Sequence, residues 1–161
     1  MITTATRATA RDGETPATIR AGTAADCAAI EGLLTDSHLP TAGVGELLAT
    51  RPADFFVATD GPTDELVAVA GLEVCCDNAL LRSVAVRPVW RARGLGRVLV
   101  ERVVSEPEAR GVRGVRGVRG LYLLTMTAEH YFPRFGFERV DRSSVPADIA
   151  DSVEFKSASR A

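Results

Sequence analysis

The distribution of apolar and polar positions predicts a chain that alternates between strands and helices. Short apolar runs indicate buried strands, and other segments repeat apolar residues every three or four positions, as one face of a helix does. The clearest helix is 24–34, where that repeat follows Thr23, a residue type that often caps helices. The clearest strands are 66–76 and 79–86, and we predict that Asp77-Asn78 joins them as a tight hairpin.

Applied to the whole chain, these rules predict an α/β fold in the order β-α-α-β-β-β-α-β-α-β-β. The predicted strands are 18–21, 54–59, 66–76, 79–86, 121–126, 137–140 and 153–156. The predicted helices are 24–34, 44–49, 95–104 and 128–135. We expect the third helix to break near Val104, because Ser105 and Glu108 around Pro107 form a capping-box pattern.

The most informative segment is the link between the strand 79–86 and the helix that follows it. It reads Arg91-Ala92-Arg93-Gly94-Leu95-Gly96, a basic turn with two glycines at the start of a helix. The first N–H groups of a helix have no intrahelical partner, and the helix dipole adds partial positive charge there. Glycines let an anion approach the backbone closely. We interpret this turn as a binding site for a pyrophosphate.

The pattern Arg-x-x-Gly-x-Gly, preceded by Val84-Ala85-Val86-x-Pro88, resembles the coenzyme A signature of the GNAT superfamily of N-acetyltransferases. A second segment, Tyr131 to Phe137, resembles the aromatic and Gly-Phe motif of the same family. The resemblance covers about residues 18–156. It implies a mixed, mostly antiparallel sheet of seven strands, splayed between the fourth and fifth, with helices on both faces. It also implies acetyl-CoA as co-substrate and direct acetyl transfer in a ternary complex.

The same resemblance assigns the coenzyme contacts. The backbone of the fourth strand would pair with pantetheine, the N–H of Val84 would polarise the thioester carbonyl, and the basic turn would hold the pyrophosphate. The residues concerned are Val84, Ala85, Val86, Arg91, Ala92, Arg93, Gly94, Leu95, Gly96, Arg97 and Phe132.

This chain departs from the family at the aromatic that often protonates the leaving thiolate. Many members have a tyrosine four residues before the glycine of Gly-Phe, and this chain has Phe132, with Tyr131 one position earlier. Either the helix is shifted and Tyr131 is the acid, or the thiolate leaves without a protein acid, or activity is weak. A half-buried aromatic packed against the neighbouring helix is the alternative interpretation of Tyr131.

On the acceptor side, Glu73 is an acid in an otherwise apolar strand, and Arg82 is its counterpart on the next strand. One interpretation is a buried ion pair. In the other, Glu73 is the base or amine-binding group and Arg82 holds an acceptor carboxylate. His38, in the loop between the first two helices, and His130 are further candidates for the acceptor site, although a solvated histidine is the simpler interpretation of His38.

Length, charge and cysteine content limit the classes of protein to which this chain can belong. The 161 residues fit one domain, which we assign to 18–161, preceded by a flexible tail over 1–17 without the apolar stretch of a secretory signal. The net charge of −2 gives no reason to expect nucleic acid, and no apolar run is long enough to span a membrane. Three cysteines favour a reducing, cytoplasmic location over a disulfide framework, and we expect no metal. We expect no coenzyme role for the three Gly-Val-Arg triplets of 111–119.

The leading hypothesis is therefore an N-acetyltransferase for a small amine, with an amino-acid-like compound as acceptor. Segments 80–86, 121–125 and 135–139 also resemble GNAT proteins associated with arsenic resistance, which adds amino-acid-like arsenicals to the candidates. The alternatives are a protein or peptide N-acetyltransferase, and a coenzyme-binding module with little catalysis. A homodimer that pairs the final strands of two copies is compatible with this fold.

Overall fold

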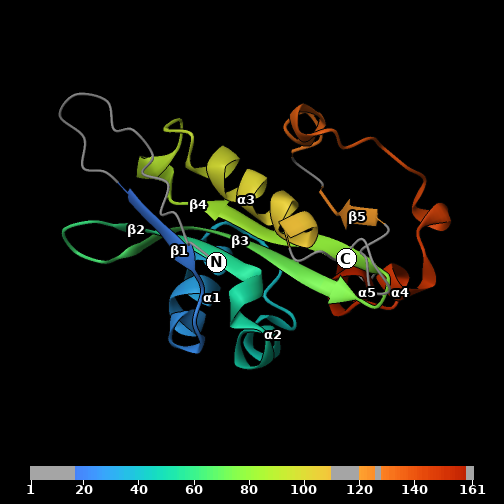
Figure 1. The fold of residues 1–161 in the computed structure, drawn as a ribbon, viewed down its shortest axis with the longest axis horizontal. Helices are drawn as coiled ribbons and strands as arrows, with labels where there is room; N and C mark the ends of the chain where they lie inside the picture. The colour runs from blue at the N-terminus through green and yellow to red at the C-terminus, as the bar shows by residue number, and fades with distance from the viewer. Residues whose placement is uncertain (1–16, 110–119, 126–127, 159–161) are drawn as a thin grey trace.

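The computed structural model describes residues 17–109, 120–125 and 128–158. The predicted tail, apart from Ala17, and the Gly-Val-Arg triplets lie outside the described residues. Within them the chain forms one mixed sheet with helices on both faces, as Figure 1 shows.

The sheet is built in sequence order, β1-β2-β3-β4-β5. The first four strands pair antiparallel with their neighbours, and β5 joins β4 in parallel. The strands are β1 (Ala17–Ala21), β2 (Phe55–Asp60), β3 (Leu66–Cys75), β4 (Asn78–Val86) and β5 (Gly120–Leu123). Cys76 and Asp77 separate β3 from β4, so the predicted tight hairpin is confirmed, one residue earlier than expected.

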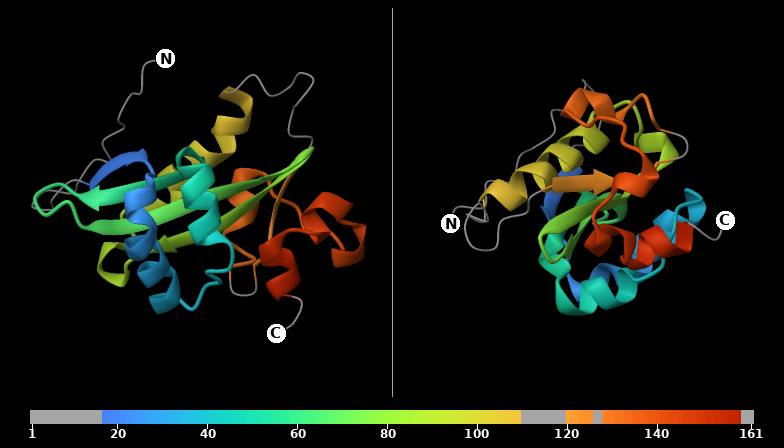
Figure 2. Two further views of the ribbon diagram at one scale, coloured as in Figure 1. Left: turned by 90° about the horizontal axis from the view of Figure 1, so that it is seen from below. Right: turned by 90° about the vertical axis from the view of Figure 1, so that its right-hand side faces the viewer.

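Helices cover the two faces of the sheet differently (Figures 1 and 2). One face packs on α3 through Leu95, Leu99, Val100 and Val103. The other face packs on α1 and α2 around the fully buried Phe55. The helices are α1 (Cys27–Asp36), α2 (Val44–Thr50), α3 (Leu95–Ala109), α4 (Ala147–Ala150) and α5 (Val153–Ala158). The 3-10 turns are η1 (Ala24–Asp26), η2 (Pro52–Asp54), η3 (Pro88–Trp90), η4 (Phe132–Phe135) and η5 (Arg142–Ser144).

Four details of the predicted element list are wrong. The described residues form five strands, not seven, because 137–140 forms no strand and the predicted strand 153–156 is the helix α5. The predicted helix 128–135 shrinks to η4, and α3 runs through Pro107 to Ala109 without the expected break.

The misread strand has a local explanation. Val153-Glu154-Phe155-Lys156 alternates apolar and charged residues, which is typical of a half-buried strand. Ser152 precedes it, however, and its hydroxyl accepts a hydrogen bond from the N–H of Phe155 (3.3 Å), as an N-cap does. Glu154 and Phe155 are both buried, although neighbouring residues of a strand with one buried face would alternate.

The last two helices sit against the start of β4. The N–H and side-chain amide of Asn78 donate to the carboxylate of Asp148 on α4, at 3.1 and 3.0 Å. Leu80 packs with Ile149 and Phe155 in a small apolar cluster of its own. On the face of the sheet that packs on α1 and α2, the start of β4 is therefore covered by the C-terminal segment.

The parallel pair β4–β5 is short, and this creates a gap in the sheet. Its register runs from Asn78↔Gly120 to Leu81↔Leu123, where β5 ends. β4 continues to Val86, and on that side its last residues pair with no described strand. This matches the predicted splay between the fourth and fifth strands.

Candidate active site

The basic turn leads directly from β4 into α3. Ala92 and Gly94 both adopt the left-handed conformation, with φ of 63° and 79°. The first bond of α3 runs from the N–H of Val98 to the carbonyl of Gly94 (3.1 Å), so the N–H groups of Leu95 to Arg97 precede the intrahelical ladder. A Cβ on Gly94 would meet nothing within 4 Å, which leaves its backbone open to an approaching group. This is the geometry expected of an anion site.

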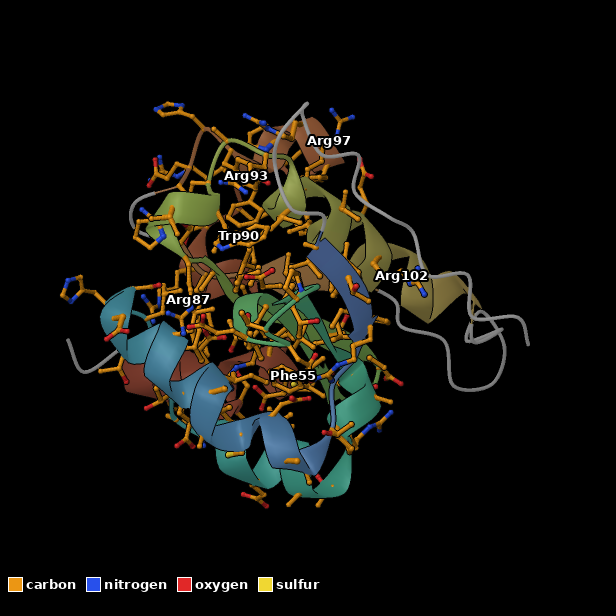
Figure 3. All side chains as sticks on the ribbon, turned by 90° about the vertical axis from the view of Figure 1, so that its left-hand side faces the viewer. Phe55, Arg87, Trp90, Arg93, Arg97 and Arg102 are labelled. Atoms are coloured by element: carbon orange, nitrogen blue, oxygen red, sulfur yellow. The ribbon has the colours of Figure 1, made fainter. Side chains whose placement is uncertain are left out.

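Arg93 and Arg97, both labelled in Figure 3, lie at the start of α3. Arg91 donates from Nε to the carbonyl of Val86 (3.0 Å), which ties the turn to the end of β4. The guanidinium of Arg93 stacks over the ring of Trp90 at 4.5 Å from its centroid. Arg97 pairs with Glu101 at 2.9 Å, and both side chains are largely exposed. The turn is thus positively charged on the side that faces solvent.

A bulge in β4 lies between Arg82 and this turn. Val69 pairs with Ala85 and Gly71 with Arg82, so β4 contributes one more residue than β3 over this stretch. Ser83 takes up the extra residue with a left-handed φ of 59°. The bulge re-aims the backbone at Ser83 and Val84, at the place where β5 has already ended. The backbone groups assigned to pantetheine, Val84 to Val86, therefore line the gap between the strands.

Tyr131 and Phe132 lie in different environments, although they are neighbours in the sequence. Phe132 is buried in the apolar cluster beneath α3 and contacts the ring of Phe137 edge-on, with centroids 6.0 Å apart. Tyr131 is half-buried, and its hydroxyl is 3.2 Å from where a Cβ on Gly96 would lie, with Val86 also adjacent to that point. The tyrosine hydroxyl is therefore at the start of α3, next to the gap.

Tyr131 is also held as a neutral hydroxyl. Burial raises the pKa of Tyr131, and the nearby Arg134 and Arg97 oppose the rise. The guanidinium of Arg134 lies over the ring at 4.4 Å. At neutral pH this side chain can donate a proton or a hydrogen bond.

On the opposite face of β4, the ion pair between Glu73 and Arg82 is present. Arg82 Nη1 is 2.9 Å from Glu73 Oε2, and the arginine side chain has no exposed surface. Its Nη2 donates to the carbonyl of Ala42 (2.6 Å) and its Nε to Ser83 Oγ (3.3 Å). The guanidinium is thus engaged on all three nitrogens, which favours the ion-pair interpretation over an arginine waiting for an acceptor carboxylate.

Sequence reasoning missed Glu154, which joins this pair from α5. Its Oε2 is 3.9 Å from Arg82 Nε, and its side chain is 8% exposed. Burial raises the pKa of Glu154 to about 7; Arg82 opposes the rise and Glu73 adds to it. The predicted strand 153–156 gave no reason to single out this residue, because a charged residue that alternates with apolar ones in a strand is expected to face solvent.

The two histidines stay apart from these groups. His38 is exposed in the turn after α1 with a left-handed φ of 57°, and its N–H donates to the carbonyl of Thr35 (3.1 Å). His130 is exposed before η4. In the part of the chain that the structure describes, no group of three or more His, Cys, Asp or Glu could hold a metal ion. None of the described helices is both long and apolar enough to cross a membrane.

The described fold resembles several solved acetyltransferase structures. The Mycobacterium tuberculosis protein Rv2747, in complex with CoA and NLQ, superposes with a TM-score of 0.63 at 24% identity, over 83% of this chain and 78% of that one. N-acetylglutamate synthase from Neisseria gonorrhoeae, complexed with coenzyme A and L-arginine, gives 0.64 at 21% identity, over 83% of this chain and 30% of that one. At such identities the likeness concerns the fold.

Sequence comparison adds the family. The chain is 45% identical over 49 residues to the [ribosomal protein bS18]-alanine N-acetyltransferase of Salmonella typhimurium, over 30% of this chain and only a third (33%) of that relative. A family profile described as the acetyltransferase (GNAT) domain matches residues 51–139, more than half of the chain, and includes β4, the basic turn and Tyr131. This chain therefore belongs to the GNAT family of acetyltransferases, in which acetyl-CoA is the co-substrate.

Proposed function

We propose that this protein is an acetyl-CoA-dependent N-acetyltransferase that transfers the acetyl group directly to an amine. The observation that carries the proposal is the gap beside β4: pairing with β5 ends at Leu81, β4 continues to Val86, and the gap leads to the open N–H groups of α3. A chain in extended conformation can pair with such an edge, as in strand addition.

The residues present fit the coenzyme. The backbone of Val84 to Val86 would bind the pantetheine arm, and the N–H groups of the turn would bind the pyrophosphate. A Cβ at Gly96 would come within 3.2 Å of the Tyr131 hydroxyl, so a side chain there would press on this tyrosine at the start of α3. When bound, the coenzyme supplies an acetyl group activated as a thioester.

Two side chains of this protein would move protons. An amine must be neutral to attack, and we assign Glu73 as the group that accepts its proton, directly or through water. Tyr131 is our candidate for the acid that protonates the leaving thiolate, because its hydroxyl lies at the gap and stays protonated at neutral pH. Phe132, buried in the core, would support the coenzyme only through packing.

Two of the three cysteines, Cys75 and Cys27, favour direct transfer over an acyl-enzyme. A cysteine nucleophile reacts as the thiolate. Burial raises the pKa of Cys75 to about 12, with the carboxylates of Glu73 and Asp148 adding to the rise. Burial also raises the pKa of Cys27, so neither thiol is prepared for attack at neutral pH.

The acceptor class has two candidates. The first is an amino-acid-like amine, an arsenical included. The second is the α-amine of a peptide or protein, and two observations favour it: the matched segment of a ribosomal-protein alanine N-acetyltransferase, and the enclosure of Arg82, which leaves that guanidinium no exposed surface for a free carboxylate. Acetylation of a peptide with an N-terminal alanine, compared with that of free amino acids, separates the two.

Thermal unfolding with acetyl-CoA tests the coenzyme site. A ligand at a hundredfold excess over its Kd stabilises the native state by about 2.7 kcal/mol, which corresponds to a rise of about 5–10 °C in Tm for a chain of this size. We expect this rise in the wild type and its loss in a Gly94→Glu, Gly96→Glu variant, whose carboxylates repel the pyrophosphate. Gly32→Glu is the matched control, since that exposed position has nothing within 4 Å of its Cβ. No rise in the wild type would refute the proposed function.

A further inference from the structure

One residue of the bulge in β4 has a backbone conformation that a side chain rarely adopts. Ser83 has a left-handed φ of 59° and is 7% exposed, although it lies inside a strand. Such a conformation is strained for most residues other than glycine, and it persists only where the surrounding structure enforces it. Ser83 and Val84 together stand against the single residue Ala70 of β3, so neither has a β3 partner of its own. The neighbours of Ser83 therefore have to hold the bulge in place.

Arg82, directly before Ser83, is anchored on several sides. Its Nη2 donates to the carbonyl of Ala42 (2.6 Å), its Nη1 donates to the Glu73 carboxylate on β3 (2.9 Å), and its Nε donates to the Ser83 hydroxyl (3.3 Å). The carboxylate of Glu154 lies farther away, at 3.9 Å from Nε. We call Arg82, Ala42, Glu73 and Glu154 the Arg82 cluster. The arginine side chain has no exposed surface, so water does not compete for its donors.

The loop that contains Ala42 lies close against this guanidinium. It joins α1 to α2, on the face of the sheet opposite α3 (Figure 2). Gly43, the next residue, has a left-handed φ of 78°, and a Cβ there would lie 3.7 Å from Arg82 Nη1. The guanidinium therefore has one anchor on this loop and another on β3, and both are independent of the pairing of the bulge itself.

We infer that Arg82 is a positioning residue for the coenzyme: by holding Ser83 in its left-handed conformation, it aims the backbone N–H of Val84 at the acetyl thioester. The inference rests on the proposed coenzyme contacts of β4. Val84 follows Ser83 directly, and the pairing of β4 with β5 has already ended at Leu81, so the bulge sets the direction of this N–H. A backbone donor stabilises charge on a carbonyl oxygen only when it is aimed at that oxygen. Because Arg82 also binds Glu73, it keeps the proposed proton acceptor at a fixed distance from the donor.

Infrared difference spectroscopy of bound acetyl-CoA tests this inference without any acceptor. The full-length protein binds acetyl-CoA with a carbon-13 label at the thioester carbonyl, whose stretching frequency falls when its oxygen accepts a hydrogen bond. Lysine cannot keep the forked contacts of arginine, so we expect a higher frequency in Arg82→Lys than in the wild type. Arg20→Lys is the matched control, because Arg20 also binds a carboxylate (Asp26, 2.7 Å) and a carbonyl (Ala21, 3.1 Å), but next to β1, at the other edge of the sheet. It should keep the wild-type frequency.

An unchanged frequency in Arg82→Lys overturns the inference, and so does an equal rise in Arg20→Lys. If circular dichroism finds Arg82→Lys unfolded, Ser83→Ala replaces it, since it removes only the hydroxyl that accepts from Arg82 Nε. That variant must also raise the frequency, and the wild-type value in it overturns the inference as well. Failure of acetyl-CoA to raise the Tm of the wild type refutes the proposed function instead, so the two failures are told apart by the Tm measurement.

Discussion

Gly71 should be among the least replaceable glycines of this protein. It lies on β3 directly opposite Phe55 of β2 on one side and Arg82 of β4 on the other, so the three residues form a row across one face of the sheet. A Cβ on Gly71 would stand 2.4 Å from Phe55 Cε1 and 2.7 Å from Cδ1. The glycine thus leaves the space that the Phe55 ring fills, next to the Arg82 cluster.

The magnitude for Gly71→Ala follows from these contacts. Ordinary contacts of a Cβ begin at about 3.4 Å, so the ring would have to move by about 1 Å. Phe55 has no exposed surface, so it cannot move into solvent. Overpacking of this kind costs about 1–3 kcal/mol, and the lower chain entropy of alanine returns up to about 1 kcal/mol. We expect a net loss of about 1–2 kcal/mol, or about 2–8 °C in Tm.

Urea unfolding of a double-mutant cycle measures this loss. Phe55→Leu creates room, so the double variant Phe55→Leu, Gly71→Ala should cost at least about 1 kcal/mol less than the sum of the single variants. Gly32→Ala, the same substitution on the exposed side of α1, should be neutral or stabilising by up to about 1 kcal/mol. A Gly71→Ala protein as stable as the wild type, or strict additivity in the cycle, would refute the packing argument.

Three further predictions concern titration and catalysis. Because the folded-state pKa of Glu154 is raised from 4.5 to about 7, its contribution to stability is full below pH 4.5 and is lost as pH rises to about 7. Urea unfolding between pH 4.5 and about 7 measures this effect: wild type should lose up to about 3 kcal/mol of unfolding free energy relative to Glu154→Gln. Parallel curves of unfolding free energy against pH for the two proteins would contradict this. Arg20 binds Asp26 through two hydrogen bonds of 2.7 and 2.8 Å and lowers the pKa of Asp26, so this contribution is present above pH 3.8 and is lost as pH falls through the lowered value. Asp26→Asn should remove about 0.5–1 kcal/mol at pH 7 and progressively less as pH falls through that lowered pKa, a small value because the side chain of Arg20 is 36% exposed. Tyr131→Phe should lower kcat for acetyl transfer about tenfold or more while keeping the acetyl-CoA-induced rise in Tm, and an unchanged kcat would remove Tyr131 as the acid.

The parts of this fold that could be predicted from the sequence are those fixed by local pattern. The hairpin between β3 and β4 and the basic turn before α3 depend on neighbouring residues, and both are where the sequence indicated. The ion pair of Glu73 and Arg82 could be proposed because a tight hairpin fixes the register of its strands.

The parts that could not be predicted depend on packing between distant segments. The segment 153–156 has the alternation of a strand, but a helix forms there because Phe155 packs on Leu80 and Ser152 caps its first turn. Tyr131 is one position from the motif's tyrosine, and only the packing of η4 against α3 brings its hydroxyl to Gly96. Sequence spacing carries no information about either contact.

The candidate active site has two parts, the coenzyme turn and the residues around Arg82, and they differ in how far apart their residues lie in the sequence. The coenzyme turn and the end of β4 lie between Val84 and Arg97, within a few residues of one another. The Arg82 cluster instead brings together Ala42, Glu73 and Glu154, the last of which is made only after α3 and β5. The residues of the coenzyme turn are therefore synthesised well before Glu154, the residue that completes the set around Arg82. A ribosome-bound chain stalled after η4 would contain the whole coenzyme turn and still lack Glu154.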